Sequence, residues 1–243
     1  MSSNTPVLRL EAVTKSFSGK KAVDLLNLSI EAGEIYVFLG PNGAGKTTTM
    51  KIAVGLIRPE HGNVSILGKS VQSFVGHGTP VPFSYIPEEP HLYERLTARE
   101  FFHFIGETAG ISKSLVSERV QDYGQRLGVM DFIDDAAITY SHGMRQRVAV
   151  TGALISKPTL LVIDEPLVGL DPTTAIALKA ILRELAAEGS SILLSTHTLP
   201  IAEELADRIG VMNLGRIVAE GPPASLATKG ETLEQAFMRL TRA

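Results

Sequence analysis

The chain has 243 residues and a formal net charge of -3 at neutral pH, and it contains no cysteine. This length suits one large α/β domain or a domain with an inserted subdomain. Because positive and negative residues are interspersed, the sequence forms no basic surface for a nucleic-acid backbone, and no nucleic-acid partner is expected. The lack of cysteine excludes a disulfide framework and a thiolate metal site, and no apolar run approaches the roughly 18 residues that a membrane-spanning helix needs.

The amino-terminal region changes from strand to helix patterns. Residues 7–30 alternate apolar and polar side chains around a turn at Ser18-Gly19, which predicts a small antiparallel sheet. The short apolar run from Ile35 to Leu39 is typical of a buried parallel strand, and a helix is predicted from about Lys46 to Leu56.

Further short apolar runs predict the other strands of a twisted mixed sheet. They lie at Val64–Leu67, Tyr85–Ile86, Leu160–Ile163, Ile192–Leu194 and Ile209–Met212. Amphipathic helices without strands are predicted at residues 98–109 and 113–127, which indicates an inserted helical subdomain. A last amphipathic helix at residues 233–240 is expected to dock its apolar side on the domain.

A glycine-rich loop follows the first buried strand. Its sequence, Gly40-Pro41-Asn42-Gly43-Ala44-Gly45-Lys46-Thr47-Thr48, has the spacing of the phosphate-binding loop, whose backbone N–H groups cradle a polyphosphate at a helix N-terminus. We expect Lys46 to neutralise the β and γ phosphates of a nucleotide, Thr47 to bind Mg²⁺ and Thr48 to contact the α phosphate. A glycine-rich turn with a chance lysine is the alternative.

A second apolar strand ends in two adjacent carboxylates, Asp164 and Glu165. A buried strand that finishes in paired charge indicates a bound cation or a proton transfer. We interpret Asp164 as a ligand of Mg²⁺ through a water molecule, and Glu165 as the group that accepts a proton from an attacking water. The alternative is a strand that simply enters solvent.

A histidine stands at the end of a third apolar strand. His197 follows Ile192 to Thr196, and ligands of open α/β sheets bind at the carboxyl ends of strands, so His197 is a candidate to contact a γ phosphate. The other five histidines have no such placement and are expected to be structural or solvated: His61, His77, His91, His103 and His142.

The order of these motifs resembles one family over residues 8–240. The phosphate loop, then Tyr140-Ser141-His142-Gly143-Met144, then the Asp164-Glu165 strand, then Gly169-Leu170-Asp171 and finally His197 are similar to the motifs of the ATP-binding cassette (ABC) ATPases. In that family the stretch at residues 140–144 is the signature, which binds the γ phosphate of ATP held by the other cassette of a dimer. The resemblance implies that Ser141 and Gly143 act in this way, while Ser141 can also cap a helix.

Some positions differ from the commonest family pattern. Tyr140, His142 and Met144 stand where leucine, glycine and glutamine are usual, and Glu88 replaces the glutamine of the family's Q-loop. A carboxylate at position 88 can still approach Mg²⁺ or the attacking water, but it adds negative charge beside the two strand-end carboxylates and is expected to slow hydrolysis without abolishing it. Similar departures occur in a branch of cassettes that pair with separate exporter-type membrane proteins.

Further roles follow from the same resemblance. Phe17 resembles the aromatic residue that stacks on adenine, with Val23 packing nearby, although a phenylalanine in the core of the first sheet is an alternative. Asp171 resembles the aspartate that crosses the dimer interface, and it also suits a helix N-cap. The surface from Glu88 to Arg95, with His91-Leu92-Tyr93 as the apolar contact, is where the family docks its membrane partner.

The resemblance implies an α/β fold of the phosphate-loop NTPase type, with a mixed RecA-like core sheet. Residues 1–243 would form a single ABC ATPase domain with an amino-terminal antiparallel β-subdomain, an inserted α-helical subdomain at about 90–155 and a carboxy-terminal helix at about 231–242. Its cofactors would be ATP and Mg²⁺. It would dimerise on ATP, with a copy of itself or with a paralogous cassette, and drive conformational change in a separate permease, of exporter type, at the cytoplasmic face of the cell membrane.

Two other functions remain open at this stage. A soluble cassette could act as an ATP-gated clamp on ribosomes or nucleic acid, but such proteins usually carry two cassettes or a long coiled-coil insert, and this chain has one cassette and no heptads. An unrelated phosphate-loop kinase would not need the sequence at residues 140–147.

Overall fold

The computed structural model describes residues 5–74, 80–228 and 230–241, so His77 lies outside the described residues. Strands β1 (Leu8–Phe17) and β2 (Lys20–Ile30) form the predicted antiparallel hairpin, in which Leu8 pairs with Ile30. Ser18 and Gly19 both have positive φ, 48° and 80°, as a tight two-residue hairpin turn requires.

The antiparallel sheet has four strands in the order β2-β1-β4-β5. Strand β4 (His61–Ile66) pairs with β1, and the short β5 (Lys69–Ser70) pairs with β4. The prediction that the run at 64–67 belongs to the mixed sheet is therefore wrong. Its alternating burial matches the half-covered face of an antiparallel sheet, and the pairing of Leu8 with Ile66 decides which sheet it joins.

The second sheet is the predicted mixed one, with six strands in the order β10-β9-β3-β8-β7-β6. Only β10 runs antiparallel to its neighbour. The bounds of its strands are β3 Ile35–Leu39, β6 Phe83–Ile86, β7 Leu160–Asp164, β8 Ser191–Thr196, β9 Arg208–Asn213 and β10 Arg216–Gly221. Every residue of β3, β7 and β8 is buried, because helices or the other sheet cover both faces.

Two hydrophobic cores lie on the two faces of this sheet. On one face, alternate residues such as Phe38 and Val162 pack with helix α1 (Lys46–Ala53) and with the antiparallel sheet. On the other face, Val37 and Ile163 pack in a core that includes residues of α5 (Pro172–Ala187) and α6 (Leu199–Leu205). Since α1 starts at the carboxyl end of β3, the loop between them lies at the edge of the sheet where ligands of parallel sheets bind.

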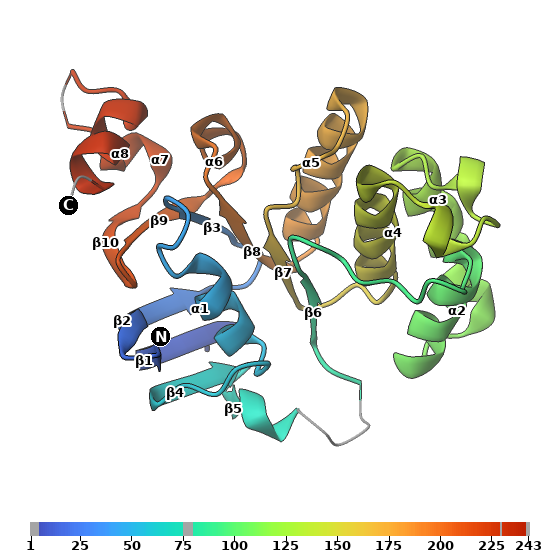
Figure 1. The fold of residues 1–243 in the computed structure, drawn as a ribbon, viewed down its shortest axis with the longest axis horizontal. Helices are drawn as coiled ribbons and strands as arrows, with labels where there is room; N and C mark the ends of the chain where they lie inside the picture. The colour runs from blue at the N-terminus through green and yellow to red at the C-terminus, as the bar shows by residue number, and fades with distance from the viewer. Residues whose placement is uncertain (1–4, 75–79, 229, 242–243) are drawn as a thin grey trace.

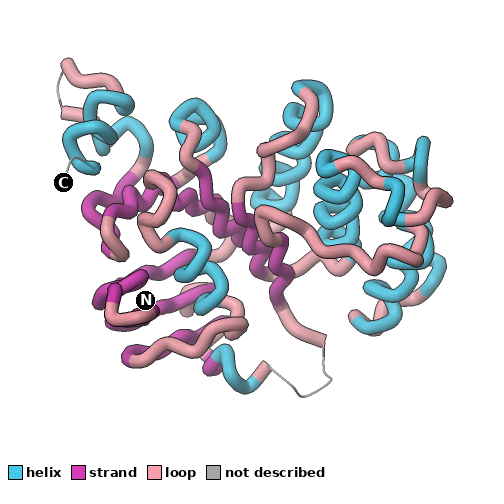
Figure 2. Tube along the Cα trace, in the orientation of Figure 1, coloured by secondary structure: helices cyan, strands magenta, loops and turns pink. Residues whose placement is uncertain are grey.

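Three helices pack on one another at the far end of the molecule from the antiparallel sheet (Figures 1 and 2). They are α2 (Ala98–Thr108), α3 (Lys113–Arg126) and α4 (His142–Ile155), and α2 and α3 match the predicted helices to within one residue. Thr97 and Glu100 form a capping box at the start of α2, and Ser112 caps α3. Helix α4 also contacts β6, which joins the three helices to the mixed sheet.

The chain ends in two helices, α7 (Pro223–Leu226) and α8 (Leu233–Thr241), beside β9 and β10. Leu233 and Ala236 are buried, which confirms that α8 docks its apolar side on the rest of the chain. The expected α/β fold, with an antiparallel sheet, a mixed sheet and helical segments, is confirmed. Among the described residues, no helix combines the length and apolarity needed to cross a bilayer.

Candidate nucleotide site

The loop between β3 and α1 has the backbone of a phosphate-binding loop. Gly45 precedes α1 with a φ of 106°, and a Cβ at this position would lie 2.3 Å from the carbonyl oxygen of Ala22, so only glycine fits. Gly43 has a φ of 79° and open space beside it. The loop thus carries backbone N–H groups at a helix N-terminus with room for an anion.

The Lys46 side chain lies inside this loop and is buried. Its ammonium donates hydrogen bonds to the carbonyl oxygens of Gly40, at 2.7 Å, and Pro41, at 3.2 Å. Burial lowers the pKa of Lys46, and the carboxylates of Glu165, Asp164 and Glu88 act in the opposite direction. These interactions hold the ammonium where the phosphates of a nucleotide would lie.

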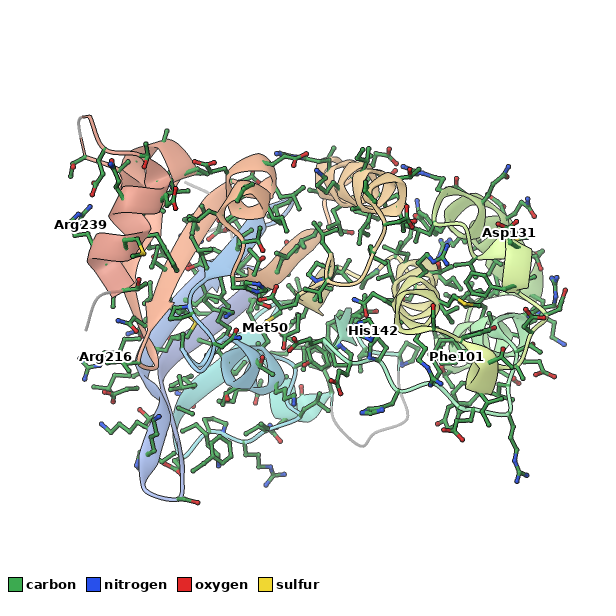
Figure 3. All side chains as sticks on the ribbon, turned by 45° about the horizontal axis from the view of Figure 1, so that its top comes forward. Met50, Phe101, Asp131, His142, Arg216 and Arg239 are labelled. Atoms are coloured by element: carbon green, nitrogen blue, oxygen red, sulfur yellow. The ribbon has the colours of Figure 1, made fainter. Side chains whose placement is uncertain are left out.

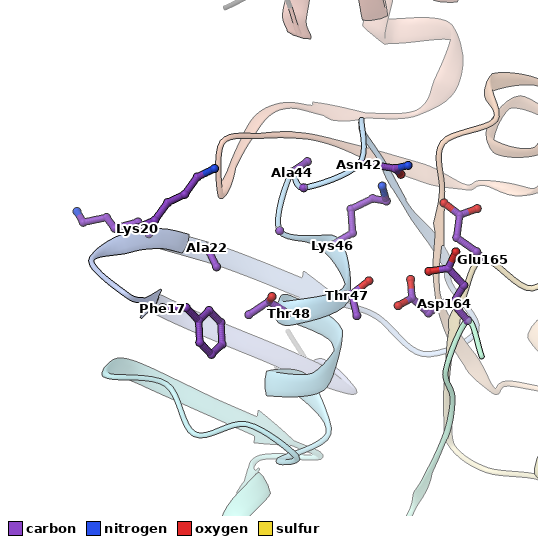
Figure 4. A pocket seen from close by; sticks show the side chains of 14 residues that line it. Phe17, Lys20, Ala22, Asn42, Ala44, Lys46, Thr47, Thr48, Asp164 and Glu165 are labelled. Atoms are coloured by element: carbon purple, nitrogen blue, oxygen red, sulfur yellow. The ribbon is translucent and has the colours of Figure 1, made fainter. Parts of the chain in front are cut away.

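A pocket of about 410 Å³ opens beside the loop, within the size range of small-molecule sites (Figure 4). Most of the predicted site residues line it, namely Phe17, Asn42, Gly43, Ala44, Gly45, Lys46, Thr47, Thr48, Glu88, Asp164 and Glu165. Lys20, Lys21 and Ala22 of β2 also line it, and no motif in the sequence pointed to them. Segments more than 140 residues apart in the chain therefore meet at one cleft.

Phe17 stands at the end of β1 with 48% of its surface exposed. The alternative of a core phenylalanine is therefore wrong, because the ring faces the pocket, where it can stack on a base. Val23 is different, since it is completely buried in the core beneath the antiparallel sheet. Val23 thus packs near the pocket, as the resemblance implies, and its neighbour Ala22 is the residue that lines the pocket.

Asp164 is 1% exposed at the end of β7. Its Oδ1 accepts a hydrogen bond from Ser195 Oγ of the neighbouring strand β8, whereas its Oδ2 is buried without a partner. A buried carboxylate oxygen is costly to leave unpaired, so this atom fits the water shell of a cation. The described residues contain no group of three histidine or acidic side chains placed to hold a metal, so other ligands of such a cation would be Thr47, water and nucleotide oxygens.

Glu165 and His197 come together at the carboxyl ends of β7 and β8. His197 Nδ1 lies 2.9 Å from Glu165 Oε1, and the Glu165 side chain is buried while the His197 side chain is half exposed. Glu165 has a φ of 48°, an unusual conformation for a non-glycine residue, and its N–H donates to Ser195 Oγ at 3.1 Å. The backbone thus turns the Glu165 carboxylate toward His197 and the pocket.

The residues at the start of α4 lie apart from this pocket. Ser141 is the N-cap of α4, and its Oγ accepts a hydrogen bond from the N–H of Met144. Neither Ser141 nor Gly143 lines the pocket. Gly143 instead approaches the loop that follows Glu165, because a Cβ on it would lie 2.8 Å from the carbonyl oxygen of Gly169.

Known proteins share the sequence motifs and the architecture of this chain. The family model described as "ABC transporter" matches residues 23–168. The daunorubicin/doxorubicin resistance ATP-binding protein DrrA of Streptomyces peucetius is 36% identical over 225 residues, which cover 91% of this chain and 67% of DrrA. The Nod factor export ATP-binding protein I of Ralstonia nicotianae is 33% identical over 93% of this chain and 70% of its own length. The solved structure of an ATP-binding subunit of an ABC transporter superposes with a TM-score of 0.90 at 31% identity, covering 97% of this chain and all of that one.

The chain belongs to the ABC transporter family. It is an ATP-binding subunit of an ATP-driven transporter and has the ATPase activity of that family. The pocket beside the phosphate loop therefore belongs to an ABC cassette, and its residues can be compared with the family pattern.

The structure explains one departure from the commonest ABC signature. Tyr140 is buried, its hydroxyl accepts a hydrogen bond from the N–H of Ala98 at 3.1 Å, and it donates to the carbonyl oxygen of Asp135 at 2.8 Å. Tyr140 thus ties the start of α4 to the start of α2, where a leucine could only pack. His142 lies at the first turn of α4 (Figure 3). A Cβ on Gly169 would lie 2.7 Å from the ring of His142, so this ring lies against Gly169.

The ABC Q-loop position, Glu88, lines the pocket together with Asp164 and Glu165. Tyr85 lies three residues before it on β6, with its hydroxyl buried and without a hydrogen-bond partner. Burial and, to a smaller extent, the charges of Asp164 and Glu88 raise the pKa of the Tyr85 phenol well above its usual value, so this hydroxyl stays protonated.

Asp171 caps helix α5, as predicted for an N-cap residue. Its Oδ1 accepts a hydrogen bond from the N–H of Thr174 at 3.0 Å, and its Oδ2 accepts one from Thr174 Oγ1 at 2.6 Å. Asp171 does not line the pocket of its own chain, which leaves its family role across a dimer interface as a proposal.

Proposed function

We propose that two cassettes bind two ATP molecules head to tail, each between the phosphate loop of one chain and Ser141 and Gly143 of the other. One observation carries this proposal: the two parts of the site are separate within one chain, where Ser141 and Gly143 are absent from the residues that line the pocket. The exposed N-terminus of α4 offers N–H groups and a favourable dipole to an anion. The second cassette is a copy of this chain or a paralogue, and Asp171 lies at the interface.

Within each site, the residues of the pocket have distinct roles. Lys46 binds the β and γ phosphates, residues 42–48 surround the phosphates through their backbone and side chains, and Phe17 stacks on adenine. Glu165 accepts a proton from the water that attacks the γ phosphorus, so that a bond to the water oxygen forms as the bond to ADP breaks. His197 orients Glu165 and contacts the γ phosphate.

A magnesium ion completes the site in this proposal. Thr47 and, through water, Asp164 would hold it, with Glu88 close by, and it would neutralise charge on the β and γ phosphates. The unpartnered Oδ2 of Asp164 supports this assignment. The carboxylates of Asp164, Glu165 and Glu88 lie near one buried lysine, so negative charge is in excess there. This excess also favours the binding of a divalent cation together with the nucleotide.

The partner of this subunit is, in our proposal, a separate membrane permease. Residues 88–95 lead from the pocket to α2, and exposed Tyr93 packs edge to face on exposed Phe104 with ring centroids 5.8 Å apart. Exposed aromatic side chains of this kind commonly mark a protein interface. The names of the relatives, drug resistance and Nod factor export, support export as the direction of transport and the cytoplasmic face of the membrane as the location.

We also propose that residues 1–243 form one cassette domain. The packing of α2, α3 and α4 beyond the edge of the mixed sheet supports a helical subdomain at about 90–155. The docking of α8 on β9 supports a carboxy-terminal helix at about 231–242.

Replacing Phe17 with alanine is expected to weaken ATP binding by roughly 1–3 kcal/mol, about 5- to 150-fold, because the base loses its stacking partner. The dissociation constant can be measured by titration with a fluorescent ATP analogue. Phe104→Ala, which removes another exposed phenylalanine far from the pocket, is the matched control. An unchanged dissociation constant for Phe17→Ala would contradict the assignment of the base site.

Affinity purification tests the proposed function as a whole. The Glu165→Gln chain would be purified with ATP and Mg²⁺ from detergent-solubilised membranes of its source cell, and the Lys46→Ala chain would be purified in parallel. A polytopic membrane protein at near-equal amount, which is the expected result, also identifies the permease. Recovery of ribosomes or nucleic acid alone would contradict the transport assignment and favour the soluble clamp.

A further inference from the structure

Two buried polar atoms without hydrogen-bond partners lie on neighbouring strands beside the pocket. They are the Tyr85 hydroxyl on β6 and Oδ2 of Asp164 on β7. Among the described residues, only the side-chain atoms Gln72 Nε2 and Gln146 Oε1 are buried and unpartnered in the same way. Such atoms are rare in folded proteins, and a pair of them, one donor and one acceptor, calls for a physical explanation.

The strand register places both side chains on the same face of the mixed sheet. Strands β6 and β7 are parallel, and Tyr85 pairs with Val162. Both residues pack in the core on the α1 side of the sheet. Asp164 lies two residues beyond Val162, and side chains two positions apart point to the same face. The phenol of Tyr85 is therefore one strand away from Asp164, on the side of the sheet where α1 carries Thr47.

The charges around the Tyr85 hydroxyl also support an interaction with Asp164. Asp164 and Glu88 are the charged groups that act on the Tyr85 phenol. A neutral hydroxyl can donate a hydrogen bond to either carboxylate without adding negative charge to a site that already holds Asp164, Glu165 and Glu88 against Lys46. An ionised oxygen has two lone-pair positions, so Oδ2 of Asp164 can accept from Tyr85 and from a second donor.

We propose that Tyr85 is a positioning residue of the magnesium–ATP site, whose hydroxyl donates a hydrogen bond to Oδ2 of Asp164, directly or through one water, once nucleotide and cation are bound. Ser195 already holds Oδ1, and Tyr85 would fix the other oxygen. Outer hydrogen bonds of this kind orient metal-binding carboxylates and are nearly as important as the ligands themselves. The proposal rests on the magnesium site proposed above, and it gives an otherwise unpaired hydroxyl a partner in the bound state.

Tyr85→Phe removes the hydroxyl and keeps the ring. In a Glu165→Gln background, which prevents turnover, we would measure the dissociation constant of ATP with Mg²⁺ and with EDTA, and the melting temperature of the nucleotide-free protein. Affinity with Mg²⁺ is expected to fall roughly tenfold or more, while affinity with EDTA stays the same. The melting temperature without nucleotide is expected to stay the same or rise, because the hydroxyl has no partner there.

Tyr36→Phe is the matched control for the same chemical change. The buried Tyr36 hydroxyl donates to Glu220 Oε1 at 2.7 Å, and neither residue lines the nucleotide pocket. This variant should have a lower melting temperature and an unchanged ratio of the two dissociation constants.

Three results would overturn the role of Tyr85. The first is a ratio of the two dissociation constants equal to that of the parent chain because neither affinity changes, and the second is the same unchanged ratio because both affinities fall equally. The third is a fall in melting temperature like that of Tyr36→Phe. If the parent chain itself binds ATP equally with and without Mg²⁺, the magnesium site fails, and the role of Tyr85 fails with it.

Discussion

Glu165→Gln is expected to lower ATP hydrolysis by roughly 10²- to 10⁴-fold, the range for losing a general base. Glu165 is the carboxylate that lines the pocket, contacts His197 at 2.9 Å and sits on a backbone with φ of 48°, so its position is strongly determined. Glutamine has almost the same shape but cannot accept the proton of the attacking water. Phosphate release under saturating ATP and Mg²⁺ measures the effect.

Binding should survive the same substitution, because Lys46 and the loop N–H groups hold the phosphates. The dissociation constant of ATP is therefore expected to stay close to that of the parent chain. Glu118→Gln, an equal change at an exposed position of α3, should leave both hydrolysis and binding as they were. A Glu165→Gln chain that hydrolyses ATP at nearly the parent rate would show that another group is the base.

Ser141→Arg is expected to abolish ATP-dependent dimerisation while the single chain still binds ATP. Ser141 lies outside the pocket of its own chain, so the substitution does not touch the nucleotide that this chain holds. In the proposed dimer, the serine meets the γ phosphate of the partner's ATP, and the larger arginine side chain would keep the two chains apart. With Ser141→Arg made in a Glu165→Gln background, light scattering in the presence of ATP and Mg²⁺ gives the mass of the monomer or dimer directly.

Ser112→Arg is a suitable control for this experiment. Ser112 also caps a helix through a hydrogen bond from a backbone N–H, that of Leu115, and it is also exposed. Both variants lose an N-cap, worth about 0.5–2 kcal/mol of stability, but only Ser141→Arg should lose the dimer. A dimer of unchanged mass would refute the role of Ser141 between chains.

The local parts of this site could be predicted from sequence because their chemistry lies in short segments. The phosphate loop needs a strand, a glycine-rich loop, a lysine and a helix in that order, and residues 35–53 contain all of them. The carboxylates at the end of β7 could be predicted for the same reason. A fully buried strand that leads into Asp164 and Glu165 is unusual without a function.

Features set by pairing between distant segments could not be predicted in this way. The run at 64–67 joined the antiparallel sheet because β4 pairs with β1, more than 50 residues earlier in the chain. Register shifts in the pairing of β1 with β2 interrupt the two-residue alternation, so the pattern did not reveal whether Ala22 or Val23 faces the pocket. The unpaired hydroxyl of Tyr85 likewise becomes visible only when β6 and β7 lie side by side.

Hydrolysis by a mixture of two damaged chains tests the shared site most directly. Glu165→Gln and Ser141→Ala would be mixed in equal amounts, after each alone has been measured. If each site uses Glu165 of one chain and Ser141 of the other, a mixed dimer has one intact site, and the mixture should reach about a quarter of the parent rate, since half of randomly paired dimers are mixed. A rate equal to the average of the two variants alone would contradict a site shared between two copies of this chain, and with it their proposed head-to-tail dimer.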